Sequence, residues 1–273
     1  MPELPEIETV KRGIKALEGQ TIVGVVIRNH SLRYLVDAHL HQILKQSIVN
    51  KIERRAKYLI FDIVSKNKTG YLIIHLGMSG SLSLTDNRQS LKKHDHVDIL
   101  FANGAILRYN DPRRFGCIVY TTNLDDNNLL KHLGPEPLNP EFSTKYLFDK
   151  LKNKSSTIKQ LIMDNAIVVG VGNIYACEAL FMARISPLRA GNSLSKKEVT
   201  LLVDCIKKVL AQAIELGGST LRDYKQANGD LGYFQNVHNV YGRSGKNCNK
   251  CGSLILEKRL GQRNSFYCNN CQK

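Results

Sequence analysis

Four cysteines near the C-terminus have a spacing that suits a metal ion. Two residues separate Cys248 from Cys251, two separate Cys268 from Cys271, and 16 residues lie between the pairs. Such turns present four thiolates to a tetrahedral Zn²⁺ ion, and four sulfur ligands leave no open position for a reactive water. We therefore predict one structural zinc ion. Disulfides are the weaker alternative, because we expect a reducing compartment.

A glycine-containing turn offers a second place for chemistry. An apolar run ends in Gly170-Val-Gly172, and a helical pattern begins at Asn173. A dinucleotide fold needs a third small residue where Tyr175 stands and an acidic residue about 20 positions later, and the sequence has neither. Free backbone N–H groups at a helix start bind phosphate, so Asn173 marks either a phosphate site or a simple helix cap.

Charged residues in two further segments favour an anionic partner over a metal. Strand alternation puts His94 and His96 on one face, and two ligands do not make a catalytic metal centre. We predict structural hydrogen bonds or one phosphate contact for them. The arginine pairs 54–55 and 113–114 each lie beside a turn and an aromatic residue, which suits DNA, although such charges are usually just solvated.

The composition of the whole chain also indicates nucleic acid. Lys+Arg 39 against Asp+Glu 24 gives a formal net charge of +15 over 273 residues, of which 42% are hydrophobic. A sizeable core is expected, which excludes disordered and fibrous classes, and a merely basic soluble protein is the alternative. No apolar run reaches the ~20 residues of a membrane span, and the N-terminus is unlike a secretory signal. We expect a cytoplasmic protein without membrane contact.

Two kinds of element must position these residues. The N-terminal half has a helical pattern over 5–17 and then β-rich runs that predict a sandwich or barrel, at 21–28, 47–54, 58–64, 71–76, 97–101 and 118–121, with a helix near 37–45. Three prolines within 133–140 predict a domain boundary. The second half is helical, with patterns at 144–152, 157–164, 173–182 and 195–216. The Gly- and Asn-containing segment 217–237 is the kind of long loop that is usually functional.

Several short motifs follow one another along the chain. In chain order they are Met-Pro-Glu-Leu-Pro-Glu at 1–6, Arg-Arg-Ala-Lys-Tyr-Leu at 54–59, His-Leu-Gly-Met-Ser-Gly at 75–80, Lys-His-Asp-His at 93–96, Asp-Pro-Arg-Arg-Phe-Gly at 111–116, Gly-Val-Gly-Asn-Ile-Tyr-Ala at 170–176, Gly-Gly-Ser-Thr-Leu at 217–221, Val-Tyr-Gly-Arg at 240–243, and the four-cysteine segment with Gln-Arg at 262–263. Taken together, these motifs resemble those of the formamidopyrimidine-DNA glycosylase family, bacterial repair enzymes that remove oxidised purines. The resemblance spans essentially the whole chain.

This resemblance implies an α+β chain with three parts. The expected parts are an N-terminal helix with a catalytic β-sandwich at 1–134, a helix-two-turn-helix DNA-binding domain at 135–236, and a zinc finger at 237–273. Segment 217–237 resembles the lid over a base that has been flipped out of the duplex. The expected partner is damaged double-stranded DNA, and the expected state is a monomer.

The N-terminus gains a chemical meaning from this resemblance. Removal of Met1 exposes the secondary amine of Pro2, and α-amino groups titrate near pH 8, so a useful fraction is unprotonated at neutral pH. Attack of that amine on the sugar C1′ displaces the base and forms an iminium, which makes the strand prone to elimination. Glu3 stands where it can move a proton. A frayed terminus is the alternative in the absence of the other motifs.

The resemblance assigns further roles residue by residue. Lys57 resembles the residue associated with β-elimination, and Arg263 the one associated with δ-elimination. His94, Arg113, Lys154, Asn173 and Tyr241 resemble residues that bind the DNA backbone. Flipping a base leaves a hole in the duplex, which costs a few kcal/mol, and Met78, Arg113 and Phe115 resemble the three residues that fill it.

The expected function is therefore a bifunctional DNA glycosylase and AP lyase of base excision repair. It excises 8-oxoguanine and formamidopyrimidines through a Schiff base on Pro2 and then cleaves the strand by β,δ-elimination. Three alternatives differ in chemistry: the sister endonuclease VIII type, which excises oxidised pyrimidines; a zinc-containing binder of damaged DNA without turnover; and a metal-dependent nuclease, for which the sequence has no carboxylate cluster.

Overall fold

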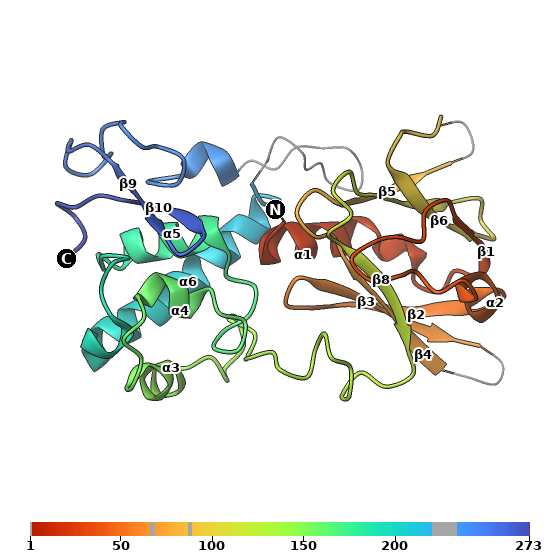
Figure 1. Ribbon diagram of the computed structural model, residues 1–273, viewed down its shortest axis with the longest axis horizontal. Coiled ribbons are helices and arrows are strands. Elements are labelled where there is room, and N and C mark those ends of the chain that lie inside the picture. The colour runs from red at the N-terminus through yellow and green to blue at the C-terminus, as the bar shows by residue number, and fades with distance from the viewer. Residues whose placement is uncertain (1, 66–68, 87–88, 220–233) are drawn as a thin grey trace. The chain divides into compact units, whose positions relative to one another are not determined.

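The chain forms two compact units. The computed structural model describes residues 2–65, 69–86, 89–219 and 234–273. One unit comprises residues 1–131 and 217–233, and the other comprises 132–216 and 234–273 (Figure 1). The segment expected to act as a lid spans 217–237, and its residues 220–233 lie outside the described residues.

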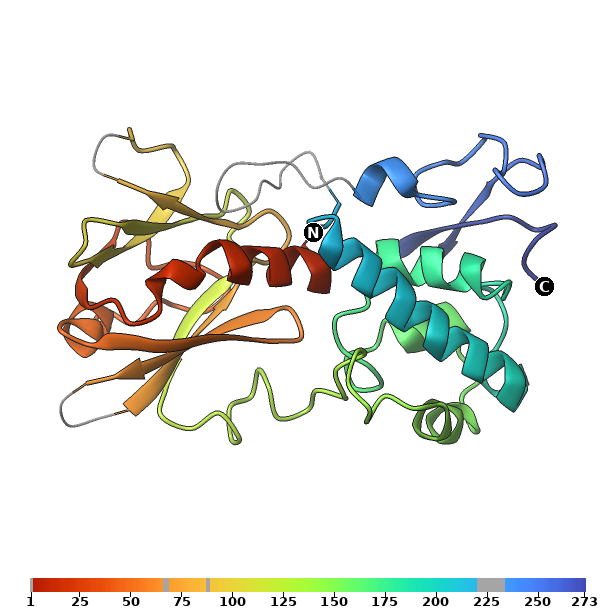
Figure 2. The ribbon, with the colours of Figure 1, turned by 180° about the vertical axis from the view of Figure 1, so that it is seen from behind.

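The first unit opens with helix α1, Leu4–Gly13, followed by the 3-10 helix η1, Lys15–Leu17. Pro5 lies in the first turn of α1, where a missing backbone N–H costs no helical hydrogen bond. The residues at helical spacing, Ile7, Val10 and Ile14, are buried in the core of this unit. Figure 2 shows α1 running alongside the strands. The helix predicted over 5–17 is thus present, with its last turn tightened.

Two four-stranded antiparallel sheets make up the rest of this unit. One has the order β1-β6-β7-β5 and the other β2-β3-β4-β8. The strands are β1 Ile22–Ile27, β2 Ile48–Arg55, β3 Tyr58–Val64, β4 Thr69–His75, β5 Ser81–Thr85, β6 Asp95–Phe101, β7 Ile106–Asn110 and β8 Cys117–Thr121, with the short helix α2, Leu40–Leu44, between β1 and β2. This is the predicted β-sandwich.

The sandwich core comes from alternate residues of both sheets. Leu59, Phe61 and Ile63 of β3 lie in the same buried cluster as Val97 and Ile99 of β6. Alternation of this kind is what an antiparallel strand with one core-facing side produces. The β-rich runs predicted from the sequence correspond to strands, and the structure adds β5 and β7, which the sequence pattern does not predict.

The second unit is helical and ends in a β-hairpin. Its elements are α3 Thr144–Leu151, α4 Ile158–Ile162, α5 Asn173–Met182, η2 Gly191–Ser193, α6 Lys196–Glu215, η3 Phe234–Val237, β9 Leu256–Leu260 and β10 Arg263–Tyr267. Side-chain oxygens of Ser143, Thr157 and Ser195 accept backbone hydrogen bonds at the starts of α3, α4 and α6. The predicted helices are all present. Among the described residues, no helix combines the length and apolar character that crossing a membrane requires.

Candidate active site and DNA interface

The N-terminal residues lie buried at the start of α1. Pro2 and Glu3 are both buried. The carboxylate of Glu6, which is 0% exposed, accepts hydrogen bonds from the backbone N–H of Glu3 and of Ser219, each at 2.8 Å. Gly218 has a φ of +78°, and a Cβ there would lie 2.9 Å from Oε1 of Glu6. One carboxylate thus joins the predicted nucleophile segment to the first residues of the predicted lid.

Lys57 occupies the tight turn between β2 and β3. Arg55 pairs with Tyr58 across the two strands, so residues 56 and 57 form the turn, and Ala56 has a φ of 54°. The Lys57 side chain is half-buried. A two-residue hairpin turn fixes the direction of its side chains tightly, because the ladder bonds end on either side of it.

His75 lies close to this turn, and sequence reasoning did not single it out. Its ring is 4.7 Å from that of Tyr58, and its Nδ1 accepts a hydrogen bond from the N–H of Gly77 at 3.0 Å. Burial, and then the positive charges of Lys57 and Arg33, lower the pKa of His75 from 6.5 to about 4. The neutral ring therefore carries its proton on Nε2, and that N–H is a hydrogen-bond donor. The signal in the sequence was a histidine between a buried strand and a glycine turn.

Two loops at one end of the sandwich carry the residues predicted to fill the hole in DNA. Met78 is half-buried in the turn between β4 and β5, and Arg113 and Phe115 are exposed in the loop between β7 and β8. The Arg113 guanidinium lies 4.7 Å from the centre of the Phe115 ring. A Cβ on Gly77 would come within 2.5 Å of the backbone of Phe115, so the turn and the loop touch. The structure brings these three residues into adjoining loops.

His94 lies beside the same loops. Its ring is 6.2 Å from that of His96, as strand alternation requires, and Nε2 of His96 is 2.8 Å from the carbonyl oxygen of Asp111. The half-buried side chain of His94 precedes β6. Where the chain is described, neither histidine belongs to a group able to hold a metal ion. The hydrogen-bonding role predicted for this pair holds for His96.

In the second unit, a buried lysine connects α5 to the C-terminal hairpin. Nζ of Lys159 donates to Oδ1 of Asn173 at 2.6 Å, to Oγ of Ser265 at 2.7 Å and to the carbonyl oxygen of Asn264 at 3.1 Å. Nδ2 of Asn173 donates to that same carbonyl at 3.0 Å. Asn173 is thereby held next to β10, whose first residue is the exposed Arg263. Sequence reasoning missed Lys159, which looked like an ordinary helix lysine.

Tyr241 and Lys154 occupy different surroundings in this unit. The buried carboxylate of Glu178 accepts from the backbone N–H of Val240 and of Tyr241, each at 2.9 Å. The Tyr241 ring packs edge-on against Phe266 at 5.2 Å. Lys154 lies exposed after α3, and its backbone N–H donates to the carbonyl oxygen of Leu151 at 2.9 Å.

The four predicted metal ligands converge in the second unit. The sulfur atoms of Cys248, Cys251, Cys268 and Cys271 all lie within 4.8 Å of one another, and among the described residues they form the only group suited to a metal. A tetrahedral Zn²⁺ with ~2.3 Å bonds places its sulfurs ~3.8 Å apart, which agrees with this arrangement. Four thiolates are also the donor set that structural zinc prefers. The cysteines therefore fit the predicted zinc ion.

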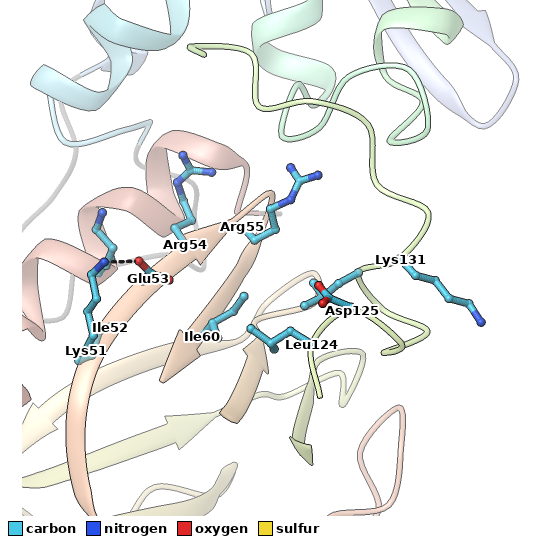
Figure 3. Close-up of a pocket in the computed structure, with 11 residues that line it drawn as sticks. Lys51, Ile52, Glu53, Arg54, Arg55, Ile60, Leu124, Asp125 and Lys131 are labelled. Carbon is cyan, nitrogen blue, oxygen red and sulfur yellow. Dashed lines mark ion pairs between the residues drawn. The ribbon is translucent and has the colours of Figure 1, made fainter. Parts of the chain in front are cut away.

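A hollow of the first unit lies against one face of the sandwich domain's β2–β3 sheet. It measures about 730 Å³ and lies against β2 and the segment around Leu124 and Leu130, as Figure 3 shows. Lys51 pairs with Glu53 at its edge. Arg54 and Arg55, one of the two arginine pairs that suit DNA, line it, whereas the residues to which the resemblance assigns a role in catalysis or DNA contact do not.

Comparisons with known protein families match three successive stretches of the chain. Family models match for the formamidopyrimidine-DNA glycosylase N-terminal domain over residues 1–118, the formamidopyrimidine-DNA glycosylase H2TH domain over 133–225, and the zinc finger found in FPG and IleRS over 245–273. The chain is 50% identical over 273 residues to the formamidopyrimidine-DNA glycosylases of Yersinia enterocolitica and Yersinia pestis, covering 100% of each.

Solved structures agree. A complex of Lactococcus lactis Fpg with abasic-site DNA has a TM-score of 0.91 at 34% identity, covering 100% of both chains. A mutant of that protein bound to Fapy-dG DNA has a TM-score of 0.92 at 34% identity and the same coverage. The MutM (Fpg) protein of Thermus thermophilus has a TM-score of 0.88 at 36% identity, over 99% of this chain and 98% of that one. The chain has a sandwich, an H2TH domain and a four-cysteine finger in this order, and it is 50% identical over its full length to curated members of one family. It therefore belongs to the formamidopyrimidine-DNA glycosylase family of DNA repair enzymes.

Proposed function

We propose that this protein excises oxidised purines, namely 8-oxoguanine and formamidopyrimidines, from duplex DNA and then cleaves the strand at the resulting site. The observation that carries the proposal is the burial of Pro2 and Glu3, the predicted nucleophile segment. Pro2 and Glu3 lie at the start of α1, and the Glu6 carboxylate joins that start to residue 219. A terminal amine held in a fixed, water-poor place is suited to nucleophilic attack.

The first chemical step needs Met1 to be removed, because the nitrogen of Pro2 is otherwise an amide. The free amine of Pro2 then attacks C1′, the glycosidic bond breaks, and its electron pair leaves with the base, which takes up a proton. Glu3 provides or relays protons at the sugar, and the sugar opens to an iminium on Pro2. The cationic iminium acidifies the neighbouring C–H groups, which prepares elimination.

Strand cleavage follows from that iminium. Loss of a proton from C2′ expels the 3′ phosphate, and a second elimination expels the 5′ phosphate. Lys57 acts in the first elimination and Arg263 in the second, because cations stabilise departing phosphates. The low pKa of His75 keeps its ring neutral at working pH. No second positive charge beside Lys57 therefore competes with that lysine for the departing phosphate.

Binding of the duplex uses residues of both units. We propose that His94, Arg113, Lys154, Asn173 and Tyr241 contact the DNA backbone, and that Met78, Arg113 and Phe115 fill the place of the flipped base. Solved relatives support damaged DNA as the ligand, since their structures contain Fapy-dG or abasic-site DNA. One zinc ion, held by the four cysteines, supports a finger whose exposed Lys258, Arg259 and Arg263 add positive charge.

The proposed organisation has three parts: a catalytic sandwich at 1–134, an H2TH domain at 135–236 with its lid at 217–237, and a finger at 237–273. We propose that the protein acts as a monomer in the bacterial cytoplasm, where its DNA substrate lies. Excision of oxidised pyrimidines is a second candidate activity, because a relative from Lactococcus lactis has been solved with DNA that contains an oxidised pyrimidine.

The experiment that tests this proposal is borohydride trapping on a duplex with one 8-oxoguanine opposite cytosine. We expect a covalent protein–DNA adduct that forms chiefly on this lesion and is weakened in a Pro2→Gly variant. A parallel duplex with thymine glycol tests the pyrimidine alternative, and trapping chiefly on that DNA would favour it. Absence of any adduct on either lesion, with zinc bound and Met1 shown to be removed, would contradict catalysis and leave damage binding.

A further inference from the structure

One buried carboxylate organises the loop that carries Arg113 and Phe115. Asp111 is 0% exposed. Its Oδ1 accepts hydrogen bonds from Oγ of Ser79 at 3.1 Å and from the N–H of Arg113 at 3.2 Å. Its Oδ2 accepts from the N–H of Gly116 at 2.9 Å and from the hydroxyl of Tyr109 at 3.2 Å. Four donors occupy the lone pairs of the carboxylate, so Asp111 acts on protein groups and not on a ligand.

The backbone of Asp111 reaches a third segment. Its N–H donates to the carbonyl oxygen of His94 at 3.1 Å, and its carbonyl oxygen accepts from Nε2 of His96 and from the N–H of Arg114. This one residue therefore connects the turn at 76–80, the start of β6 and the loop at 111–116. Each of the three segments carries a residue predicted to contact DNA.

The backbones of the turn and the loop lie too close for side chains between them. Gly77 has a φ of +62°, and a Cβ there would lie 2.5 Å from the N of Gly116. A Cβ on Gly116 would in turn lie 1.9 Å from the hydroxyl of Tyr109. Burial, followed by the Asp111 charge, raises the pKa of Tyr109, so that hydroxyl stays protonated and donates. The two loops thus form one assembly with the carboxylate at its centre.

Another buried aspartate of the same unit shows a different arrangement. Asp98 of β6 is 2% exposed and pairs with the guanidinium groups of Arg108 and Arg28. Those partners lie in or next to the strands of one sheet and stabilise the sheet. The donors to Asp111 are neutral, and three of them belong to loops that carry exposed or half-buried residues. The hydrogen bonds of Asp111 therefore hold loops in place, whereas the guanidinium groups around Asp98 neutralise its charge.

We propose that Asp111 is a positioning residue that holds Met78, Arg113 and Phe115 as one preformed wedge, so that they enter the duplex together when a base is flipped out. This inference rests on the proposed function as a base-flipping glycosylase. Filling the hole offsets the cost of unstacking only if ordering the wedge costs little. Since the carboxylate orders both loops in the folded protein, little further ordering is needed on DNA.

The test compares two substrates of the same protein. Asp111→Asn replaces one carboxylate oxygen with an NH₂ group that faces donors. We expect its single-turnover excision of 8-oxoguanine from duplex DNA to fall about tenfold or more, as loss of charge-assisted hydrogen bonds implies. Cleavage of single-stranded DNA with a preformed abasic site has no orphan base and needs no wedge. The rate at which Asp111→Asn cleaves this DNA should therefore stay within about twofold of the rate of the unaltered protein.

Asp98→Asn is the matched control, because it alters an equally buried carboxylate of the same sandwich. We expect it to lower stability and to change both substrates equally. Ser79→Ala removes a single donor from Asp111, keeps the carboxylate, and should show the same substrate split more weakly. An equal fall on both substrates in Asp111→Asn, or the same split in Asp98→Asn, would overturn the positioning role.

A readout without substrate separates this inference from the proposed function. Amide hydrogen exchange in the absence of DNA should speed up in Asp111→Asn at 76–80 and 112–117, and should stay unchanged in β1. Unchanged exchange at these loops would overturn the inference whatever the activity. If exchange is faster in Asp111→Asn but the unaltered protein excises neither 8-oxoguanine nor thymine glycol, the proposed function is overturned. Asp111 then remains the organiser of the loops.

Discussion

The ammonium group of Lys159 lies 2.6 Å from Oδ1 of Asn173, and the lysine is 1% exposed. A buried lysine normally destabilises a fold, because its charge has left water. Here three oxygen acceptors surround it, and two of them belong to Asn264 and Ser265 of β10. The charge therefore connects the start of α5 to the hairpin strand that begins with Arg263.

Lys159→Met should destabilise the second unit strongly. The variant leaves Oδ1 of Asn173 and the oxygens of residues 264 and 265 without this donor, and we expect a loss of about 3 kcal/mol in the free energy of unfolding. Urea denaturation followed by circular dichroism measures it. Lys145→Met is the control, because Lys145 is 88% exposed in its pair with Asp149, and it should change stability by less than about 0.5 kcal/mol.

Gly218→Ala and Gly104→Ala form a second matched pair. Both glycines have positive φ, +78° and +84°, but only the Cβ at 218 would meet another group, the Glu6 carboxylate at 2.9 Å. We expect about 1 kcal/mol of destabilisation from backbone strain in each, and about 1 kcal/mol more at 218. Borohydride trapping should fall in Gly218→Ala and not in Gly104→Ala. Equal effects would show that Glu6 does not couple residue 218 to the N-terminus.

Sequence patterns predicted the elements better than the contacts that set the site. Helical periodicity, capping residues and cysteine spacing are local patterns. They were therefore sufficient to predict helices α1, α5 and α6 and the group of four cysteines. Lys159 reaches Ser265 across 106 residues of chain, and Asp111 reaches Ser79 across 32. No local pattern distinguishes such a lysine or aspartate from a solvated one. Burial creates their roles, and burial depends on packing between distant segments.

Strands β5 and β7 were missed for a related reason. Ser81–Thr85 reads Ser-Leu-Ser-Leu-Thr, which alternates but is short and polar, and Ile106–Asn110 contains Arg108. In the folded sheet Arg108 is nearly buried and pairs with Asp98 of β6, its cross-strand partner. An arginine in a buried strand contradicts the simple pattern until its partner is known.

The pH dependence of stability should contain a contribution from His75. Its pKa is lowered from 6.5 to about 4, so the unfolded chain takes up the proton first as pH falls. Stability from this group is complete above pH 6.5 and declines below it, by about 2 kcal/mol between pH 7 and 5. Urea denaturation at both values should show this loss in the unaltered protein and not in His75→Gln. In Lys57→Met, the NMR titration of His75 should move to higher pH, because a positive charge is removed.

Removing the metal should unfold the finger and spare the sandwich. The buried cluster around the cysteines contains only Cys177, Phe181, Val240, Cys248, Ile255 and Cys268 among the described residues, so the hairpin has little core of its own. A strong chelator should open residues 245–273 to protease while β2 and β3 stay protected, because structural zinc contributes its binding energy to folding. Cys251→Ser should lose bound zinc, measured by atomic emission. Cys205→Ser, which alters a buried thiol of α6 outside the four-cysteine group, should keep it. Zinc retained in Cys251→Ser would contradict ligation by all four cysteines.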